Sequence, residues 1–202
     1  RNTVLFPGVV VPITAGRDKS IKLINQTNKE GKIIGVVSQK EEGEEDPGIE
    51  DINTIGTVAK ILKVLKMPDG NTTVIIQGKK RFQVAEVITT EPYLTARVRG
   101  VEEARPAKDN EEFLVIVETI KEKSLAIIKD SPNIPSDASF AIKNIESPSF
   151  LINFVSSNLN ISVAEKQSLL QINDLQERAL ETLRYMNLEL QKLSLRKDIH
   201  TK

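Results

Sequence analysis

The chain has 202 residues, enough for one large domain or two small ones around a hydrophobic core. Its 28 Lys and Arg residues equal its 28 Asp and Glu residues, so it lacks the basic excess that nucleic-acid binders and membrane-surface proteins usually carry. It contains no cysteine, which excludes disulfides and thiol chemistry and fits a reducing, cytoplasmic location. The longest uninterrupted aliphatic and aromatic run, residues 113–117, is too short to span a bilayer. No signal peptide is visible, and because the chain starts at Arg1 without an initiator Met, we expect a piece of a larger protein. Since no apolar run is long enough to span a bilayer, we expect no membrane partner.

Residues 1–101 carry strand signals that are interrupted by one short helical stretch. This stretch follows Asp18, has Ile21 and Ile24 on one side, and has Gly31 as a plausible C-terminal stop. The runs with strand character lie at 9–13, 33–39, 55–66, 71–77, 82–88 and 94–101.

The most informative stretch is residues 56–82, where two β-rich runs are joined by Met67-Pro68-Asp69-Gly70. Pro sets the backbone angle of the first central turn position, Asp tolerates the second, and Gly closes the turn. This pattern predicts an antiparallel hairpin. Residues 72–76 carry apolar or Thr side chains at both odd and even positions, which suits a closed or strongly curled sheet. We therefore predict a small β-barrel over residues 1–101, with one or two short helices.

A charged and small-residue linker is expected at 102–110, and strand signals stop after it. Residues 111–202 predict a helical bundle. Ser147-Pro148 starts one helix, Ser162 with Glu165 forms a capping box for the next, and Asp174 with Glu177 opens a long final helix. Its apolar positions follow 4-3-4-3 spacing and predict a seam against another helix; they are Ala179, Leu183, Met186, Leu190 and Leu193. The fold class is thus α+β.

Several motifs, in order along nearly the whole chain, resemble the N-terminal domain of the Lon family of ATP-dependent proteases. They are the 56–82 stretch, Leu5-Phe6-Pro7-Gly8 running to Pro12, Gly16-Arg17, Pro47-Gly48, Glu91-Pro92-Tyr93-Leu94 and Ala164–Leu170. The resemblance implies a PUA-like barrel followed by a helical bundle that leads into an ATPase module. It also implies that this piece engages damaged or unfolded protein substrates and helps to build a homo-oligomer, a hexamer in the full-length family. ATP, Mg and the Ser–Lys dyad of the serine endopeptidase would belong to modules outside this chain, so no catalytic, cofactor-binding or metal residue is expected here.

The surface that would contact substrates is predicted at two apolar loops. Phe6, Pro7, Val9 and Val10 form the first, since Pro and Gly make a loop whose neighbours stay apolar, although a loop tucked into the barrel mouth explains it as well. Leu65 and Met67, beside the hairpin turn, form the second.

Other patterns carry little chemistry. Gly78-Lys79-Lys80 lacks the upstream Gly and the following hydroxyl of a phosphate-binding loop, and we expect it between two strands. Ser194 and Lys197 match Ser-x-x-Lys but are expected on the solvated end of a helix, and they do not correspond to the family's dyad. The single histidine, His200, cannot by itself form a metal site.

Two charged segments are candidate binding sites. The acidic segment 40–51 lacks the ligand spacing of a calcium loop and is expected to be solvated. Lys79, Lys80 and Arg81 form the only tight basic cluster and are expected to be turn residues facing water. A free-standing PUA-like RNA-binding protein is the alternative reading, which the neutral net charge disfavours. A self-contained hydrolase is a third, and the lack of convergent catalytic residues disfavours it.

Overall fold

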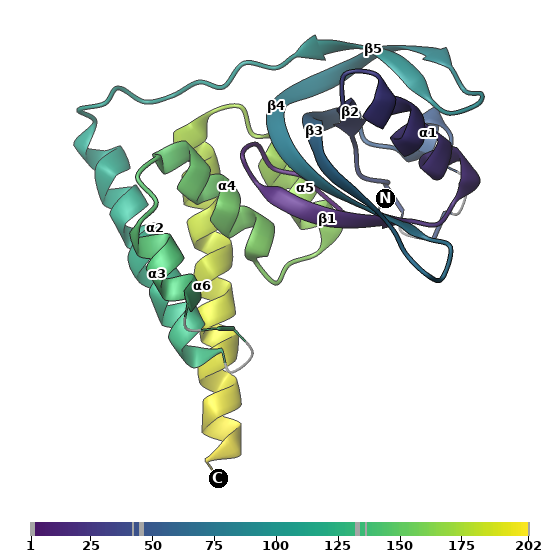
Figure 1. Cartoon of the computed structure of the whole chain (residues 1–202). Coiled ribbons are helices and arrows are strands. Elements are labelled where there is room, and N and C mark those ends of the chain that lie inside the picture. The colour runs from purple at the N-terminus through teal and green to yellow at the C-terminus, as the bar shows by residue number, and fades with distance from the viewer. Residues whose placement is uncertain (1–2, 42, 45–46, 132–133, 136, 202) are drawn as a thin grey trace. The chain divides into compact units, whose positions relative to one another are not determined.

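The computed structural model (Figure 1) describes residues 3–41, 43–44, 47–131, 134–135 and 137–201. The chain forms two compact units, residues 1–102 and 103–202, which we call the sheet unit and the helical unit. Within the described residues no helix is both long and apolar enough to cross a membrane. The α+β class predicted from the sequence is confirmed.

In the sheet unit, the residues that the structure describes form five antiparallel strands, one α-helix and a short 3₁₀ helix. Its elements are β1 (Val10–Ala15), α1 (Asp18–Lys29), β2 (Ile33–Val36), η1 (Ile49–Asp51), β3 (Ile55–Lys66), β4 (Thr72–Thr89) and β5 (Thr95–Gly100). The strand order is β1-β4-β3-β2. β1 pairs with the first half of β4, and β5 pairs with its second half. Among the described strands no pairing joins β1 to β2, so the predicted barrel takes the form of a strongly curled sheet (Figure 1).

The predicted hairpin is present between β3 and β4. The amide of Met67 donates to the carbonyl of Asn71 at 2.8 Å, and the Asp69 carboxylate accepts from the Asn71 amide at 3.0 Å. Gly70 has φ of 89°, a left-handed conformation that glycine adopts without steric cost. The turn chemistry read from the sequence therefore accounts for the hairpin.

The two strands predicted at 71–77 and 82–88 are one continuous strand, β4, of 18 residues. Lys79 and Lys80 are not in a turn: Gly78 pairs with Ala59 and Arg81 with Thr57, so the extra residue forms a β-bulge. A bulge bends a strand without ending it, which is why a charged pair can interrupt the apolar pattern inside one strand. This curvature lets the first half of β4 pair with β1 and the second half with β5.

The core of the sheet unit lies on the face of the sheet that α1 covers. Its buried members are Leu5, Ala15, Ile24, Ala59, Ile61, Val74 and Ile76. The predicted inward positions of α1 are confirmed, since Ile24 is in this core and Ile21 packs against it. The helix stops before Gly31, which has φ of 79°.

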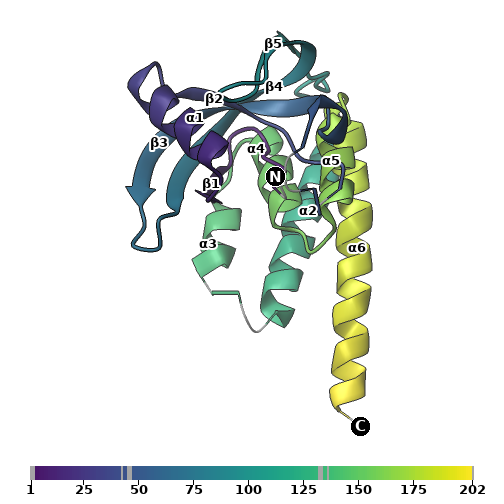
Figure 2. The same ribbon diagram turned by 90° about the vertical axis from the view of Figure 1, so that its right-hand side faces the viewer.

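The described residues of the helical unit form five α-helices: α2 (Glu111–Asp130), α3 (Asp137–Lys143), α4 (Pro148–Asn158), α5 (Val163–Gln171) and α6 (Leu175–His200). The predicted caps are confirmed, because Ser147, Ser162 and Asp174 each accept a hydrogen bond from a backbone amide in the first turn. The short α3 was not predicted, and part of the segment before it, Pro132 and Asn133, lies outside the described residues. Figure 2 shows α6 as the longest helix, and on its predicted seam Ala179 and Met186 are buried.

A buried arginine that the sequence did not single out organises the helical unit. Arg178 of α6 donates to Glu103 Oε1 at 2.8 Å, to Asn153 Oδ1 at 2.6 Å and to the carbonyl of Ile172 at 3.3 Å. Burial lowers the pKa of Arg178, and the neighbouring Glu103 opposes that shift. Glu103, inside the predicted 102–110 linker, is therefore fixed on the helical unit. Ala104 reinforces this, since it exchanges backbone hydrogen bonds with Asn173 and Leu175.

Candidate functional site

The structure buries part of the first predicted contact loop. Phe6 and Val9 are buried, Pro7 is half-buried, and Val10 is exposed. The loop is held against the sheet because the Thr57 hydroxyl donates to the Leu5 carbonyl at 2.6 Å. In addition, the Gly8 amide donates to the Gly78 carbonyl and the Gly78 amide donates to the Val9 carbonyl, both at 2.9 Å. The prediction that Phe6 and Val9 lie at the surface and contact substrates is therefore wrong. For these two residues the alternative, a loop tucked inward, is correct.

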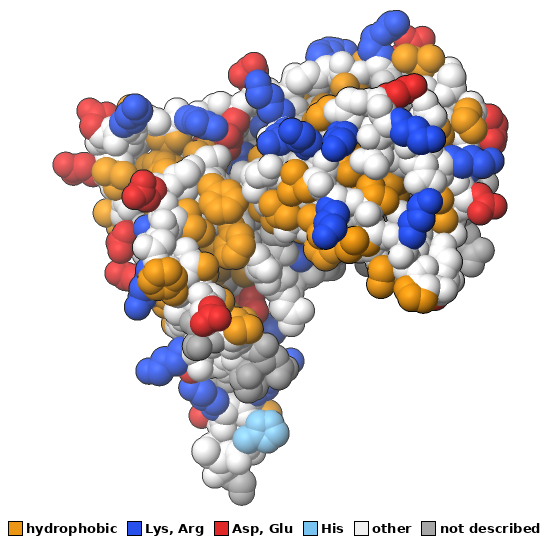
Figure 3. Space-filling model, viewed as in Figure 1, with side chains coloured by type: hydrophobic (Ala, Val, Ile, Leu, Met, Phe, Trp, Pro, Cys, Tyr) orange, Lys and Arg blue, Asp and Glu red, His pale blue; other side chains and the backbone are white. Residues whose placement is uncertain are grey.

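The second predicted loop is exposed at the tip of the β3–β4 hairpin, where Figure 3 shows hydrophobic side chains at the surface. Leu65 is 37% exposed and Met67 43% exposed. The structure does not bring this tip to Val10, because Val10 pairs with Gln77 and Leu65 with Thr73, about 13 Å apart along β4. The surviving candidates therefore form two separate small patches.

A larger apolar surface, which the sequence reading missed, lies elsewhere in the sheet unit. Two adjoining hollows of about 370 and 810 Å³ share one wall, and we call them together the groove. The 370 Å³ hollow is lined by uncharged residues only: Leu23, Thr27, Ile33, Ile34, Gly35, Val37, Ile49, Ile52, Val58, Phe82, Val84, Tyr93, Leu94, Thr95, Ala96 and Val98. Ile33, Ile49, Leu94 and Val98 are its exposed large apolar side chains. A concave apolar surface of this kind marks an interaction site in most proteins.

Polar contacts around the groove hold its walls in place. On one side the segment after β2 is folded back, because the Lys40 amide donates to the Asp51 carbonyl at 2.7 Å and the Asn53 amide to the Ser38 carbonyl at 2.9 Å. Three residues of this acidic segment, Glu42, Glu45 and Asp46, lie outside the described residues. On the other side Lys19 pairs with Glu91 at 2.8 Å, next to the turn that carries Leu94. Apolar side chains are thereby presented on backbone that is tied down at both ends.

Two of the motifs behind the family resemblance flank this groove. Pro47-Gly48 precedes Ile49, and Glu91-Pro92-Tyr93 precedes Leu94. Apolar residues directly after turn-forming residues were thus a sequence signal for the groove. Their meeting depends on strand pairing that the sequence does not show.

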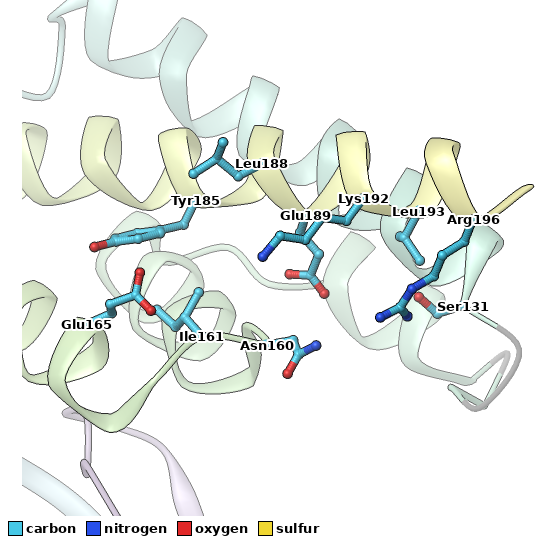
Figure 4. A pocket seen from close by; sticks show the side chains of 10 residues that line it. All are labelled: Ser131, Asn160, Ile161, Glu165, Tyr185, Leu188, Glu189, Lys192, Leu193 and Arg196. Carbon is cyan, nitrogen blue, oxygen red and sulfur yellow. The ribbon is translucent and has the colours of Figure 1, made fainter. Parts of the chain in front are cut away.

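The helical unit has a cleft of about 220 Å³ along α6, lined by polar and apolar residues alike. Figure 4 shows Tyr185, Glu189 and Lys192 projecting from α6 toward Glu165 and Asn160. Hydrogen bonding by Ser162, first through its backbone amide and then through its side chain, lowers the pKa of the Glu165 carboxyl. These contacts belong to the cap of α5, so they explain the carboxylate without a catalytic role.

The remaining candidate chemistry is dispersed. Ser194 is exposed, and Lys197 is paired with Asp130 at 2.6 Å, so the two do not form a nucleophile and base. His200 is exposed at the end of α6. Across the described part of the chain, no group of three His, Cys, Asp or Glu side chains is placed to hold a metal ion.

The basic cluster does not form a single cationic surface either. Lys79 and Lys80 are exposed at the bulge of β4, whereas Arg81 is buried and donates to the carbonyl of Glu102 at 3.1 Å. The expectation that all three face water is wrong for Arg81, because the strand continues through the cluster and turns this side chain inward.

Comparisons with known proteins agree with this architecture. Residues 1–188 match the family model described as the ATP-dependent protease La (LON) substrate-binding domain. The chain is 68% identical over 202 residues to a Lon protease of Flavobacterium johnsoniae and 46% identical to one of Cytophaga hutchinsonii. It is covered completely in both cases but spans only 25% of each relative's length.

Solved structures match the fold. The N-terminal domain of the Mycobacterium avium complex Lon protease superimposes with a TM-score of 0.74 at 22% identity, covering 92% of this chain and 94% of that one. The Lon N-terminal domain protein from Xanthomonas campestris gives a TM-score of 0.65 at 16% identity, over 92% of this chain and 95% of that one. Given the family model that spans residues 1–188 and relatives of this identity, the chain belongs to the LON substrate-binding domain family.

Proposed function

We propose that this chain is the non-catalytic substrate-recognition and oligomer-assembly domain of an ATP-dependent serine protease that degrades misfolded and regulatory proteins. The observation that carries the proposal is the uncharged 370 Å³ hollow of the groove, which exposes Ile33, Ile49, Leu94 and Val98. Unfolded polypeptides differ from folded ones by exposing apolar side chains, and a concave apolar surface can bury them. A single groove of this size supports weak binding, so several subunits acting together would strengthen it.

The proteolytic and ATP-driven steps belong, in this proposal, to sequence outside the chain. The residues present do not fit a nucleotide, since Gly78-Lys79-Lys80 lies at the bulge of β4 and offers no helix N-terminus to a phosphate. ATP and Mg would therefore bind only to an ATPase module outside this chain. We further propose a cytoplasmic homo-oligomer, a hexamer for the whole protein. Support comes from exposed apolar side chains on the last turns of α6, Leu195 and Ile199.

Nothing favours the RNA-binding alternative. The net charge is zero, and the only tight basic cluster is divided by the burial of Arg81. An affinity for RNA that falls steeply between low and physiological salt would reverse this conclusion.

The test compares two leucines of equal exposure. Leu94 lines the groove and Leu65 lies at the hairpin tip, and both are 37% exposed, so replacing either with Asp perturbs folding to a similar extent. We expect Leu94→Asp to weaken binding of a fluorescent unfolded protein about tenfold, which corresponds to about 1.4 kcal/mol. Leu65→Asp should leave the affinity within about twofold.

Two controls complete the experiment. The same protein in its folded state should not bind, and Leu62→Asp, on an exposed position of β3 outside the groove, should behave like the unmodified chain. Equal binding of folded and unfolded protein would refute client recognition. A larger effect from Leu65 than from Leu94 would move the site to the hairpin. Any turnover of casein by the pure chain would contradict its non-catalytic role.

A further inference from the structure

The outer edge of β2 lies along the groove, and none of the described strands pairs with it. In the strand order β1-β4-β3-β2, β2 is a terminal strand. Ile33, Ile34 and Gly35 all line the 370 Å³ hollow. Successive residues of a strand point to opposite faces, so lining by three successive residues indicates that the hollow reaches the strand's edge.

The hydrogen-bond register shows which backbone groups face this hollow. The Ile61 amide donates to the Lys32 carbonyl at 2.8 Å, and Ile34 is paired with Ala59. Hydrogen-bonded pairs alternate along an antiparallel ladder, so Lys32, Ile34 and Val36 bond to β3. The amides and carbonyls of Ile33 and Gly35 therefore point outward, toward the hollow.

The other terminal strands are protected and β2 is not. β1 contains Pro12, which cannot donate a ladder hydrogen bond, and β5 exposes Arg97 and Arg99. Proline and charged side chains are the usual means by which proteins prevent a sheet edge from pairing with another chain. The sequence of β2, Ile-Ile-Gly-Val, has neither.

We propose that the groove binds an extended, uncharged segment of an unfolded polypeptide as an added strand on the edge of β2. This inference rests on the proposed function and names the form in which a client is bound. The segment's backbone pairs with the outward groups of Ile33 and Gly35, and its alternate side chains occupy the uncharged hollow between β2 and β5. Backbone pairing is independent of side-chain identity, which suits a domain that binds many unfolded sequences.

The test uses the 202-residue chain and a blocked peptide in which three valines alternate with three threonines between two terminal lysines. Hydrogen exchange of single amides is followed by NMR, with peptide binding measured in the same titration. At saturation we expect exchange of the Ile33 and Gly35 amides to slow at least about tenfold, because they enter a ladder. The amides of Ile34 and Val36, already bonded to β3, should change little.

A chemical variation of the peptide separates strand addition from side-chain binding. N-methylating either the three valines or the three threonines removes the amides from one edge of the peptide and leaves those of the other edge. Strand addition predicts affinities that differ at least about fivefold between the two versions, because only one edge faces β2. Peptide binding with unchanged exchange at Ile33 and Gly35, or equal affinities of the two versions, overturns strand addition and leaves the proposed function standing. If neither this peptide nor an unfolded protein binds, the proposed function fails and the inference fails with it.

Discussion

The ion pair between Arg178 and Glu103 gives the sharpest prediction for stability. The same carboxylate contacts two arginines: Arg178 at 2.8 Å, with 1% of its side chain exposed, and Arg105 at 3.4 Å, with 66% exposed. The Glu103 side chain is itself 17% exposed. Burial therefore distinguishes two contacts that share one acceptor.

Arg178→Met should destabilise the helical unit by about 3–5 kcal/mol, because it removes the buried positive charge that pairs with the largely buried Glu103 carboxylate and the hydrogen bond from that guanidinium to Asn153 Oδ1. Arg105→Met should cost at most about 1 kcal/mol, since an exposed ion pair is weakened by solvent and by side-chain entropy. Glu103→Gln keeps an acceptor but removes the charge, and should fall between them at about 1.5–3 kcal/mol.

Urea denaturation followed by far-ultraviolet circular dichroism measures these differences, because the helical signal comes mainly from the helical unit. With a slope of about 1.5 kcal/mol/M, the midpoint should fall by about 2–3 M for Arg178→Met and by less than about 0.7 M for Arg105→Met. Equal shifts for the two variants would refute the reasoning, since burial would then not decide the strength of the contact.

Two further comparisons test local geometry. Gly56→Ala should destabilise the sheet unit by about 1–3 kcal/mol, because a Cβ there would overlap the carbonyl oxygen of Val36. Gly100→Ala is the control and should be near neutral, since a Cβ at that position would meet open space. Thermal unfolding compares the two variants, and equal losses of stability would contradict the packing argument. Ser162→Ala should cost about 1 kcal/mol at pH 7 by removing the cap of α5. Since the folded state lowers the pKa of Glu165, this carboxylate stabilises the fold above its unfolded pKa of about 4.3 and loses that effect as the pH falls through the folded value. Urea titrations at pH 7 and pH 3 should therefore show a smaller cost of Ser162→Ala at the lower pH, and a constant cost would contradict the capping box.

Local chemistry made much of the fold predictable. The turn at Pro68-Asp69-Gly70 and the caps at Ser162 and Asp174 depend on residues within four positions of one another, and each appears as expected. The extent of β4 was not predictable in this way. In its local sequence the charged Lys79 is typical of a turn residue. Only the pairing with β3 across the bulge keeps the strand intact.

The buried ion pair and the groove could not be found by local reasoning. Glu103 and Arg178 are 75 residues apart, and each alone is typical of a solvated residue. The groove combines Ile33, Ile49 and Val98 from segments that only the sheet topology brings together. Apolar loop composition could suggest Phe6 as a contact residue, but hydrogen bonds around its loop bury it.

The central claim is that unfolded clients bind in the groove of the sheet unit. The most direct measurement places a nitroxide spin label in the apolar segment of an unfolded client and follows the methyl signals of the isotope-labelled chain by NMR. We predict that the signals of Ile33, Ile49 and Val98 broaden while those of Leu65 and Met67 at the hairpin tip stay sharp. Broadening confined to the hairpin tip, or to Leu195 and Ile199 on α6, would contradict the claim.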